Sequence, residues 1–189
     1  MSKGYIHRDI KPANVLVKNK RYKIADFGFA CKADILGRQR LTDICGTPIY
    51  MAPQLLRNQS YTAKSDIWSL GLMLYEMVFG YPPWPCRSMH EYLNAVLHTP
   101  LKFPYNAKIG VNTKDFIKRS LVHNEDRRMS WKEVFEHPLV RHQDQGAGAP
   151  SIEVDEYVKK ILLRIQNEIQ ARNLNVNDLL RPYHGMSIS

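Results

Sequence analysis

The hydrophobic pattern begins with two short stretches, residues 14–18 and 21–25, that are typical of β-strands. Only the polar pair at residues 19–20 separates them, which predicts a tight hairpin. A longer stretch, residues 67–79, is apolar on nearly every side and predicts a buried helix that ends at Gly80. This helix is too short and, with Asp66 and Glu76, too charged to cross a bilayer.

Shorter helices are expected between residues 88 and 136, each preceded by a residue type that caps helix N-termini. The most specific signal is Ser130 with Glu133, whose spacing is that of a capping box. A His-Pro pair at residues 137–138 ends the last helix. The predicted fold class is therefore mainly α, of the α+β type, with the hairpin as its strand component. The expected helices run from Ser88 to about residue 97, from Asn112 or Thr113 to about residue 122, and from Ser130 to Glu136.

Composition narrows the class of protein. The 189 residues are 44% hydrophobic and 24% charged, which fits a folded domain rather than a disordered chain. The three cysteines are few, odd in number and without metal-ligand spacing, so we expect a reducing, cytoplasmic location. The polar start argues against a signal peptide. The net charge of +9 comes from scattered basic residues without interleaved aromatics, which favours solvated faces over nucleic-acid binding.

Two motifs carry the clearest candidate chemistry. Residues 7–14 read His-Arg-Asp-Ile-Lys-Pro-Ala-Asn, and residues 26–28 read Asp-Phe-Gly. Each residue alone is common in turns, but the ordered motifs resemble the catalytic and metal-binding loops of eukaryotic serine/threonine protein kinases. The resemblance implies transfer of the γ-phosphate of ATP to Ser or Thr of protein substrates, with ATP and Mg²⁺ as cofactors. It is loosely nearest to the autophagy-initiating ULK-type and calmodulin-dependent-group kinases.

The resemblance implies a role for the polar side chains of these loops. Asp9 would be the base or orienting group for the attacking hydroxyl, and Lys11 would place its ammonium on the γ-phosphate. Asn14 and Asp26 would hold Mg²⁺ through oxygen atoms. The catalytic residues would thus be Asp9 and Lys11, and the metal ligands Asn14 and Asp26.

Further downstream, residues 45–53 resemble the substrate-docking end of a kinase activation segment. Thr47 would sit in the docking loop and contact the catalytic carboxylate. Asp66, at the start of the predicted buried helix, would accept hydrogen bonds from the catalytic-loop backbone. His7 and Gly28 are assigned to structural support of the two loops.

One position departs from the family pattern. Kinases have Ala-Pro-Glu where this chain has Ala-Pro-Gln, and that Glu forms a buried ion pair with an Arg that Arg128 matches here. The neutral Gln54 can offer Arg128 only a hydrogen bond. An imperfectly paired buried charge can cost about 3 kcal/mol or more. We therefore expect a less rigid domain, unless Arg128 finds another acceptor.

Regulation is suggested by the residues around the expected activation segment. The resemblance implies that Arg8 binds a phosphate on that segment. Where many relatives carry the phosphorylated Thr, this chain has Asp43. Asp43 would then supply a permanent, weaker negative charge to Arg8, with Thr42 as a neighbouring phosphorylation site. The alternative is that Asp43 is an ordinary solvated loop residue.

The chain is divided into a domain, residues 1–142, a linker, residues 143–151, and a helical extension, residues 152–189. The linker is rich in Gly, Ala and Gln. Apolar residues three or four apart between positions 154 and 169 predict an amphipathic helix. This helix either packs back on the domain or binds a regulatory partner. Acidic side chains weigh against a calmodulin-type partner: Glu153, Asp155, Glu156 and Glu168.

No G-x-G-x-x-G or V-A-I-K motif occurs in the chain, although kinases use both in an N-terminal lobe. We therefore expect residues 1–142 to be the C-terminal lobe of a kinase domain, poorly active alone. The second hypothesis is a non-catalytic, kinase-like interaction module. Intact catalytic residues favour the first hypothesis, and the absent motifs favour the second.

Overall fold

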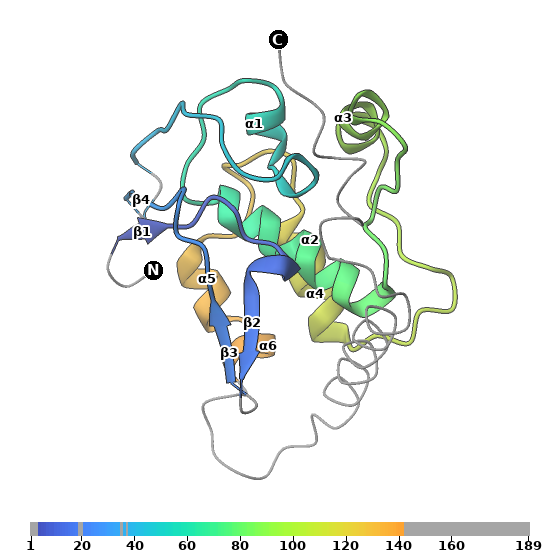
Figure 1. The fold of residues 1–189 in the computed structure, drawn as a ribbon. Coiled ribbons are helices and arrows are strands. Elements are labelled where there is room, and N and C mark those ends of the chain that lie inside the picture. Colours follow the sequence, from blue (N-terminus) through green and yellow to red (C-terminus); the bar gives the residue numbers. More distant parts are fainter. Residues whose placement is uncertain (1–3, 19–20, 35, 37, 142–189) are drawn as a thin grey trace. The chain divides into compact units, whose positions relative to one another are not determined.

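The computed structural model describes residues 4–18, 21–34, 36 and 38–141. Within this part the chain forms six α-helices, four short strands and two 3₁₀ turns (Figure 1). The expected linker and helical extension lie outside the described residues. The elements are β1 (Tyr5–Ile6), a 3₁₀ turn (Pro12–Asn14), β2 (Val15–Lys18), β3 (Arg21–Ile24), β4 (Cys31–Lys32), a second 3₁₀ turn (Pro48–Tyr50), α1 (Pro53–Leu56), α2 (Ser65–Phe79), α3 (Met89–His98), α4 (Val111–Ser120), α5 (Trp131–Glu136) and α6 (Pro138–Arg141).

The strands form two separate antiparallel pairs. Strands β2 and β3 pair from Val15 opposite Ile24 to Lys18 opposite Arg21, which confirms the predicted hairpin. Strand β1 pairs with β4 through two residues on each side. This second pair was not predicted, because two residues are too few to show an alternating pattern.

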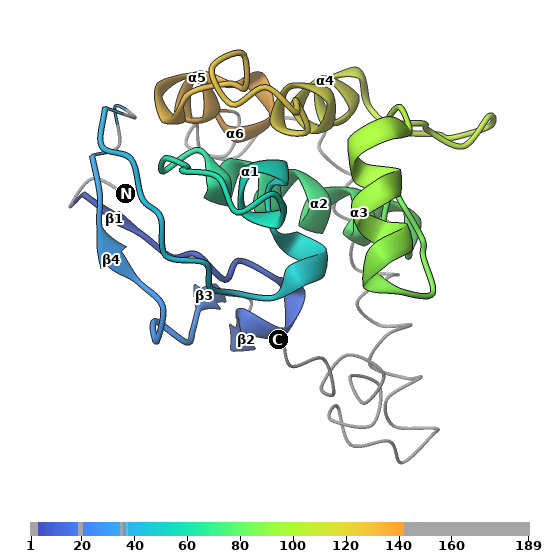
Figure 2. The same ribbon diagram turned by 90° about the horizontal axis from the view of Figure 1, so that it is seen from above.

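Helix α2 forms the centre of the core and confirms the predicted buried helix. Ile67 and Trp68 are fully buried, and Gly80 ends the helix in a left-handed conformation, with φ of 78°. Helix α4 lies against α2 at Gly71, where a Cβ atom would come 2.5 Å from the Cβ of Ser120. Figure 2 shows α2 between the strands on one side and helices α4 and α5 on the other.

The start signals of the other helices had mixed success. Ser88 caps α3, and Ser130 with Glu133 forms the complete capping box of α5, as predicted. The expected cap of α4 at Asn112 or Thr113 was wrong. Gly110 occupies the capping position in an extended conformation, so the helix starts at Val111 and Thr113 is buried within its first turn.

The His-Pro pair ends α5, but it also opens helix α6 at Pro138. Proline fits the first position of a helix, because its missing N–H would have no intrahelical partner there. None of the described helices is long and apolar enough to cross a membrane.

Candidate active site

The loop that follows strand β1 is anchored by a carboxylate from helix α2. Asp66 accepts the backbone N–H of His7 at 2.7 Å through Oδ2 and that of Arg8 at 2.9 Å through Oδ1. Burial raises the pKa of Asp66, although the two N–H donors oppose that rise. Arg8 has a left-handed backbone, with φ of 69°. Asp66 therefore holds a turn that a residue with a Cβ atom adopts at a cost.

Asp9 lies directly after this turn and is almost completely buried. Its Oδ1 accepts both the backbone N–H of Thr47, at 2.9 Å, and the Thr47 hydroxyl, at 2.7 Å. Its Oδ2 forms an ion pair with Lys11 Nζ at 2.8 Å. Lys11 also donates to the Thr47 hydroxyl at 2.7 Å. The three side chains thus form a closed ring of contacts between two loops that are far apart in sequence.

Gly46 makes the approach of these two loops possible. Its φ is 105°, and a Cβ atom at this position would lie 2.3 Å from the carbonyl oxygen of Arg8. No side chain fits at that distance. The backbone before Thr47 therefore packs directly on the backbone of the loop that carries Asp9.

The charge state of Asp9 follows from its partners. Burial alone would raise its pKa, but the hydrogen bonds from Lys11 and Thr47 outweigh burial and lower the pKa below the usual value of an aspartate. Asp9 is therefore an ionised hydrogen-bond acceptor at neutral pH. This is the state needed to orient or accept a proton from a hydroxyl group.

Asn14 and Asp26 lie at the open end of the β2–β3 hairpin. The Asn14 amide donates through Nδ2 to the backbone oxygen of Asp9 at 2.9 Å and to its Oδ2 at 3.1 Å. Its amide oxygen is thereby left as the acceptor. On the other strand, the Ala25 N–H donates to the Asn14 carbonyl at 2.8 Å, which places Asp26 one residue beyond this link.

Two sets of contacts fix the Asp-Phe-Gly segment, one from His7 and one within the segment from Gly28 to Asp26. The Nε2 atom of His7 lies 3.0 Å from the carbonyl oxygen of Ala25, and its ring centroid lies 5.1 Å from that of Phe27. The N–H of Gly28 donates to Asp26 Oδ1 at 3.2 Å. Asp26 has a left-handed backbone, with φ of 60°. These contacts turn the chain sharply at the carboxylate.

The residues present fit Mg²⁺ better than a transition metal. Asn14 and Asp26 offer only oxygen, the ligand that Mg²⁺ prefers. No group of three or more His, Cys, Asp or Glu side chains within the described ranges could hold a metal ion by itself. Mg²⁺ needs no such group, since it is usually bound by one or two protein ligands together with substrate phosphates and water.

Arg8 reaches from this loop toward residues 41–43. Its Nε donates to the carbonyl oxygen of Phe29 at 2.6 Å, and one of its terminal nitrogens lies 3.9 Å from the carboxylate of Asp43. The Arg8 side chain is 11% exposed, whereas that of Asp43 is 85% exposed. Thr42 is also exposed. The pair is therefore long and mostly solvated on its acidic side.

Gln54 and Arg128 are in contact. Arg128 donates to Gln54 Oε1 at 3.0 Å, and Gln54 Nε2 donates to the carbonyl oxygen of His123 at 2.6 Å. Arg128 also donates to the carbonyl oxygens of Lys64 and Val122, each at 3.0 Å. Arg128 therefore finds other acceptors besides Gln54, which the sequence left as an open possibility.

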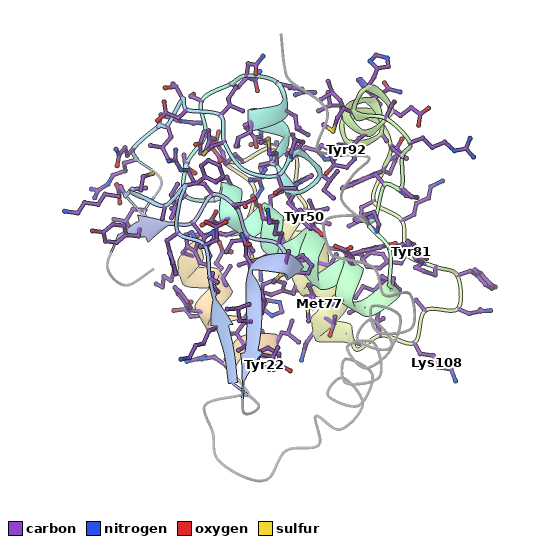
Figure 3. All side chains as sticks on the ribbon, in the orientation of Figure 1. Tyr22, Tyr50, Met77, Tyr81, Tyr92 and Lys108 are labelled. Carbon is purple, nitrogen blue, oxygen red and sulfur yellow. The ribbon has the colours of Figure 1, made fainter. Side chains whose placement is uncertain are left out.

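Tyr50 and Glu76 form a contact that the sequence did not predict. The Tyr50 hydroxyl donates to Glu76 Oε2 at 2.5 Å, and Ser69 donates to the Tyr50 carbonyl oxygen at 2.8 Å. Burial raises the pKa of Glu76, while the bond from Tyr50 opposes the rise. Figure 3 labels Tyr50 beside helix α2. The available signal was Glu76, the one carboxylate within the largely apolar stretch of residues 67–79.

This geometry agrees with the comparison to known families. The family profile of the protein kinase domain matches residues 1–140. The chain belongs to the protein kinase family. Several of the curated relatives that it is similar to are named serine/threonine-protein kinases.

Three relatives illustrate the range of similarity. Serine/threonine-protein kinase ATG1a of Arabidopsis thaliana is 37% identical over 76% of this chain and 24% of its own length. Serine/threonine-protein kinase fused of Drosophila melanogaster is 39% identical over 74% of this chain and 17% of its own length. Calcium-dependent protein kinase 14 of Arabidopsis thaliana is 34% identical over 92% of this chain and 33% of its own length. The kinase spans less than half the length of the curated relatives it matches.

Proposed function

We propose that this kinase transfers the γ-phosphate of ATP to Ser or Thr side chains of protein substrates, with Asp9 as the catalytic carboxylate. The observation that carries the proposal is the ring of contacts among Asp9, Lys11 and Thr47. An ionised Asp9 orients the attacking hydroxyl, and Lys11 offers a positive charge to the transferred phosphate. Thr47, in the docking segment, joins substrate position to the catalytic carboxylate.

Asn14 and Asp26 would hold Mg²⁺ in the active enzyme. The Asn14 amide is fixed by its two bonds to Asp9, so its oxygen is presented in a constant direction. When bound, the metal neutralises charge on the ATP phosphates. His7, Gly28 and Asp66 support the loops that carry these ligands.

We assign residues 1–142 to the C-terminal lobe of a kinase domain, residues 143–151 to a linker and residues 152–189 to a helical extension that either packs on the domain or binds a regulatory partner. The glycine-rich loop and the strand lysine of kinases are missing from this sequence. The 189-residue chain by itself should therefore transfer phosphate poorly. A cytoplasmic location is part of the same proposal.

A second candidate function is a non-catalytic interaction module. It is favoured by the exposed apolar side chains of the β2–β3 hairpin, because a patch of exposed apolar side chains is typical of a surface that binds another protein. They are Leu16, Val17, Tyr22 and Ile24, each 48% to 57% exposed.

A radiolabelled-ATP transfer assay on a generic Ser/Thr substrate separates the two. Three proteins are compared: the chain alone, the chain joined to a kinase N-terminal lobe, and the joined form with Asp9→Asn. Activity only in the joined form with Asp9 supports the catalytic proposal. A joined protein that folds and binds Mg²⁺ and ATP but transfers nothing favours the interaction module.

A further inference from the structure

Arg128 is a cation in an environment made mostly of neutral groups. Its side chain has no exposed surface, and its guanidinium lies 5.1 Å from the centre of the Trp68 ring. The acceptors within 3.5 Å are an amide oxygen of Gln54 and backbone carbonyl oxygens. Burial lowers the pKa of Arg128 to about 10, and the charge of Glu125 opposes that change. A buried charge of this kind needs an opposite charge nearby.

Glu125 is the one carboxylate within ion-pair distance of Arg128 among the residues that the structure describes. Its Oε1 lies 4.0 Å from Arg128 Nη1, and its side chain is only 5% exposed. The same Oε1 accepts the backbone N–H of Thr62 at 3.0 Å. Glu125 is therefore a buried acid held in a fixed place between Arg128 and the start of helix α2.

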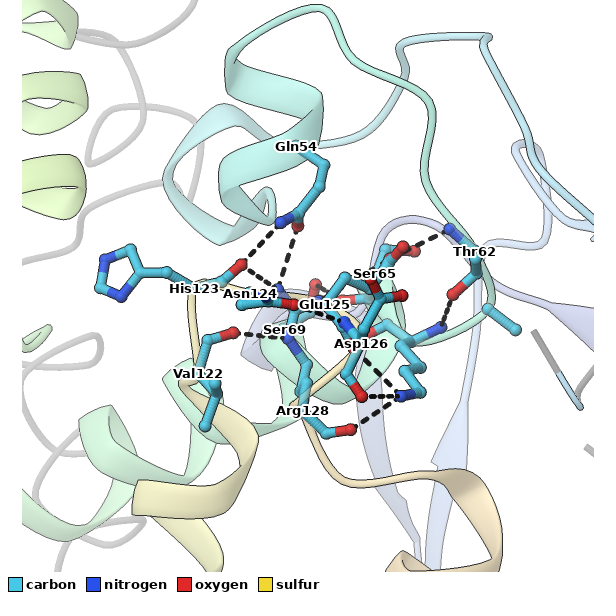
Figure 4. Close-up of polar contacts among 12 residues, drawn as sticks. Gln54, Thr62, Ser65, Ser69, Val122, His123, Asn124, Glu125, Asp126 and Arg128 are labelled. Carbon is cyan, nitrogen blue, oxygen red and sulfur yellow. Dashed lines mark hydrogen bonds and ion pairs between the residues drawn. The ribbon is translucent and has the colours of Figure 1, made fainter. Parts of the chain in front are cut away.

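The loop that carries Glu125 is itself fixed by Lys64. The Lys64 ammonium donates to the carbonyl oxygens of Glu125 at 3.0 Å, Asp126 at 3.2 Å and Arg128 at 2.9 Å. Figure 4 shows the contacts of Gln54 and Thr62 with the same loop. Three carbonyl oxygens around one ammonium leave the loop little freedom.

Residues 40–54, which include the docking segment at residues 45–53, contact this loop at both of their ends. At one end, Arg40 Nη1 donates to Glu125 Oε2 at 3.3 Å. At the other end, Gln54 binds Arg128 and the carbonyl oxygen of His123. The segment of residues 40–54 is thus bound to the loop through Arg40 at its start and through Gln54 at its end.

We propose that Glu125 is the counter-ion of Arg128, and that this pair anchors both ends of residues 40–54, the segment that presents Thr47 to Asp9. Glu125 is a positioning residue, because it touches none of the proposed reacting groups. Its effect on phosphate transfer rests on the proposed function. The ion pair and the anchoring of the segment do not depend on the proposed function, and the experiments that test them use no ATP.

The first test is urea unfolding of the full 189-residue chain. Glu125→Gln should lower the midpoint by about 1 M or more, because it leaves Arg128 buried without a counter-charge. Asp126→Asn is the matched control, since Asp126 is 83% exposed and pairs with the same Arg40 at 3.7 Å. It should shift the midpoint by less than about 0.3 M.

The decisive variant adds Gln54→Glu to Glu125→Gln. A carboxylate at position 54 stands where Gln54 Oε1 now lies, 3.0 Å from Arg128, and should restore at least about half of the lost midpoint. If Glu125→Gln alone does not fold, recovery of a folded chain in the double variant supports the proposal equally. The proposal is overturned if Glu125→Gln matches Asp126→Asn, or if the double variant is no more stable than the single one.

Hydrogen exchange separates anchoring from general stability. Arg40→Gln should speed amide exchange in residues 41–47 by about tenfold or more while changing the urea midpoint little, because the Arg40 side chain is 49% exposed. Exchange in helix α3 should stay unchanged. Equal acceleration in both regions, or none in residues 41–47, contradicts the anchoring role.

Discussion

Asp66 lies 59 positions after His7 in sequence, yet its carboxylate accepts the backbone N–H of His7 at 2.7 Å. Through this bond and the one to Arg8, the first turn of α2 determines where Asp9 stands. Because Asp66 binds backbone N–H groups, these two contacts do not depend on the side chains of His7 and Arg8. The position of the loop is thus encoded in the helix.

Asp66→Asn should destabilise the chain by about 2 kcal/mol, since an amide nitrogen would then face one of the two buried N–H donors. Urea unfolding measures the change. Asp43→Asn is the control, because Asp43 is 85% exposed and its replacement should stay within about 0.5 kcal/mol. Equal losses in the two variants would refute the anchoring role of Asp66.

The pKa of Asp9 should depend on Thr47. Because the folded-state pKa is lower than the unfolded one, the stabilisation is present above the unfolded value, about 3.9, and is lost as the pH falls through the folded value. Thr47→Val removes one donor and should raise the pKa of Asp9. A carbon-13 titration of the carboxyl group reports it, with Thr99→Val as a distant control. An unchanged titration in Thr47→Val would sink this prediction.

Gly46→Ala should displace the docking segment. Its added Cβ atom meets the Arg8 carbonyl oxygen at 2.3 Å in addition to the strain of a positive φ, so we expect a loss of about 3 kcal/mol. Gly80→Ala isolates the second effect, because Gly80 has φ of 78° and no atom within 4 Å of an added Cβ. Gly80→Ala should cost about 1 kcal/mol in thermal unfolding. Similar losses at both positions would show that the close approach is unimportant.

Asp43 should act on activity and not on stability. In the chain joined to a kinase N-terminal lobe, Asp43→Ala should lower kcat several-fold if Asp43 supplies the charge that orders Arg8. The urea midpoint of unfolding should stay the same. Asp126→Asn, which removes another exposed acid, controls for the change in net charge. Unchanged activity in Asp43→Ala would leave Asp43 as an ordinary solvated residue.

The sequence allowed the hairpin, helix α2 and the capping box of α5 to be predicted, because each depends on a local pattern. The motifs likewise pointed to Asp9, Asn14 and Asp26, although their roles remain predictions. The start of α4 was misplaced, since Asn112 and Thr113 are of residue types that cap helices, whereas Gly110 takes the capping position and Thr113 is buried in the first turn.

Glu125 was out of reach for a different reason. In sequence it is one charged residue in a charged run, and nothing local marks it as buried. Its burial follows from contacts with Thr62, Arg40 and Arg128, which come from three separate parts of the chain. That another group replaces the missing negative charge at position 54 could be inferred only as a possibility, because a sequence pattern does not specify which distant acid pairs with the buried Arg128.

The exposed hairpin has a consequence for the order of folding. Neighbouring residues of a strand point to opposite faces, and both Leu16 and Val17 are more than half exposed, so each face of β2 carries an exposed apolar side chain. A hairpin with an exposed apolar side chain on each face gains little free energy from burial, and its strand register is weakly specified. We therefore expect it to form late in folding and to unfold locally before the rest of the domain. Mg²⁺ held by Asn14 and Asp26, the two ligands proposed above, would stabilise the paired form of the hairpin. The amide protection of β2 and β3 should grow with the concentration of Mg²⁺ and nucleotide by simple mass action.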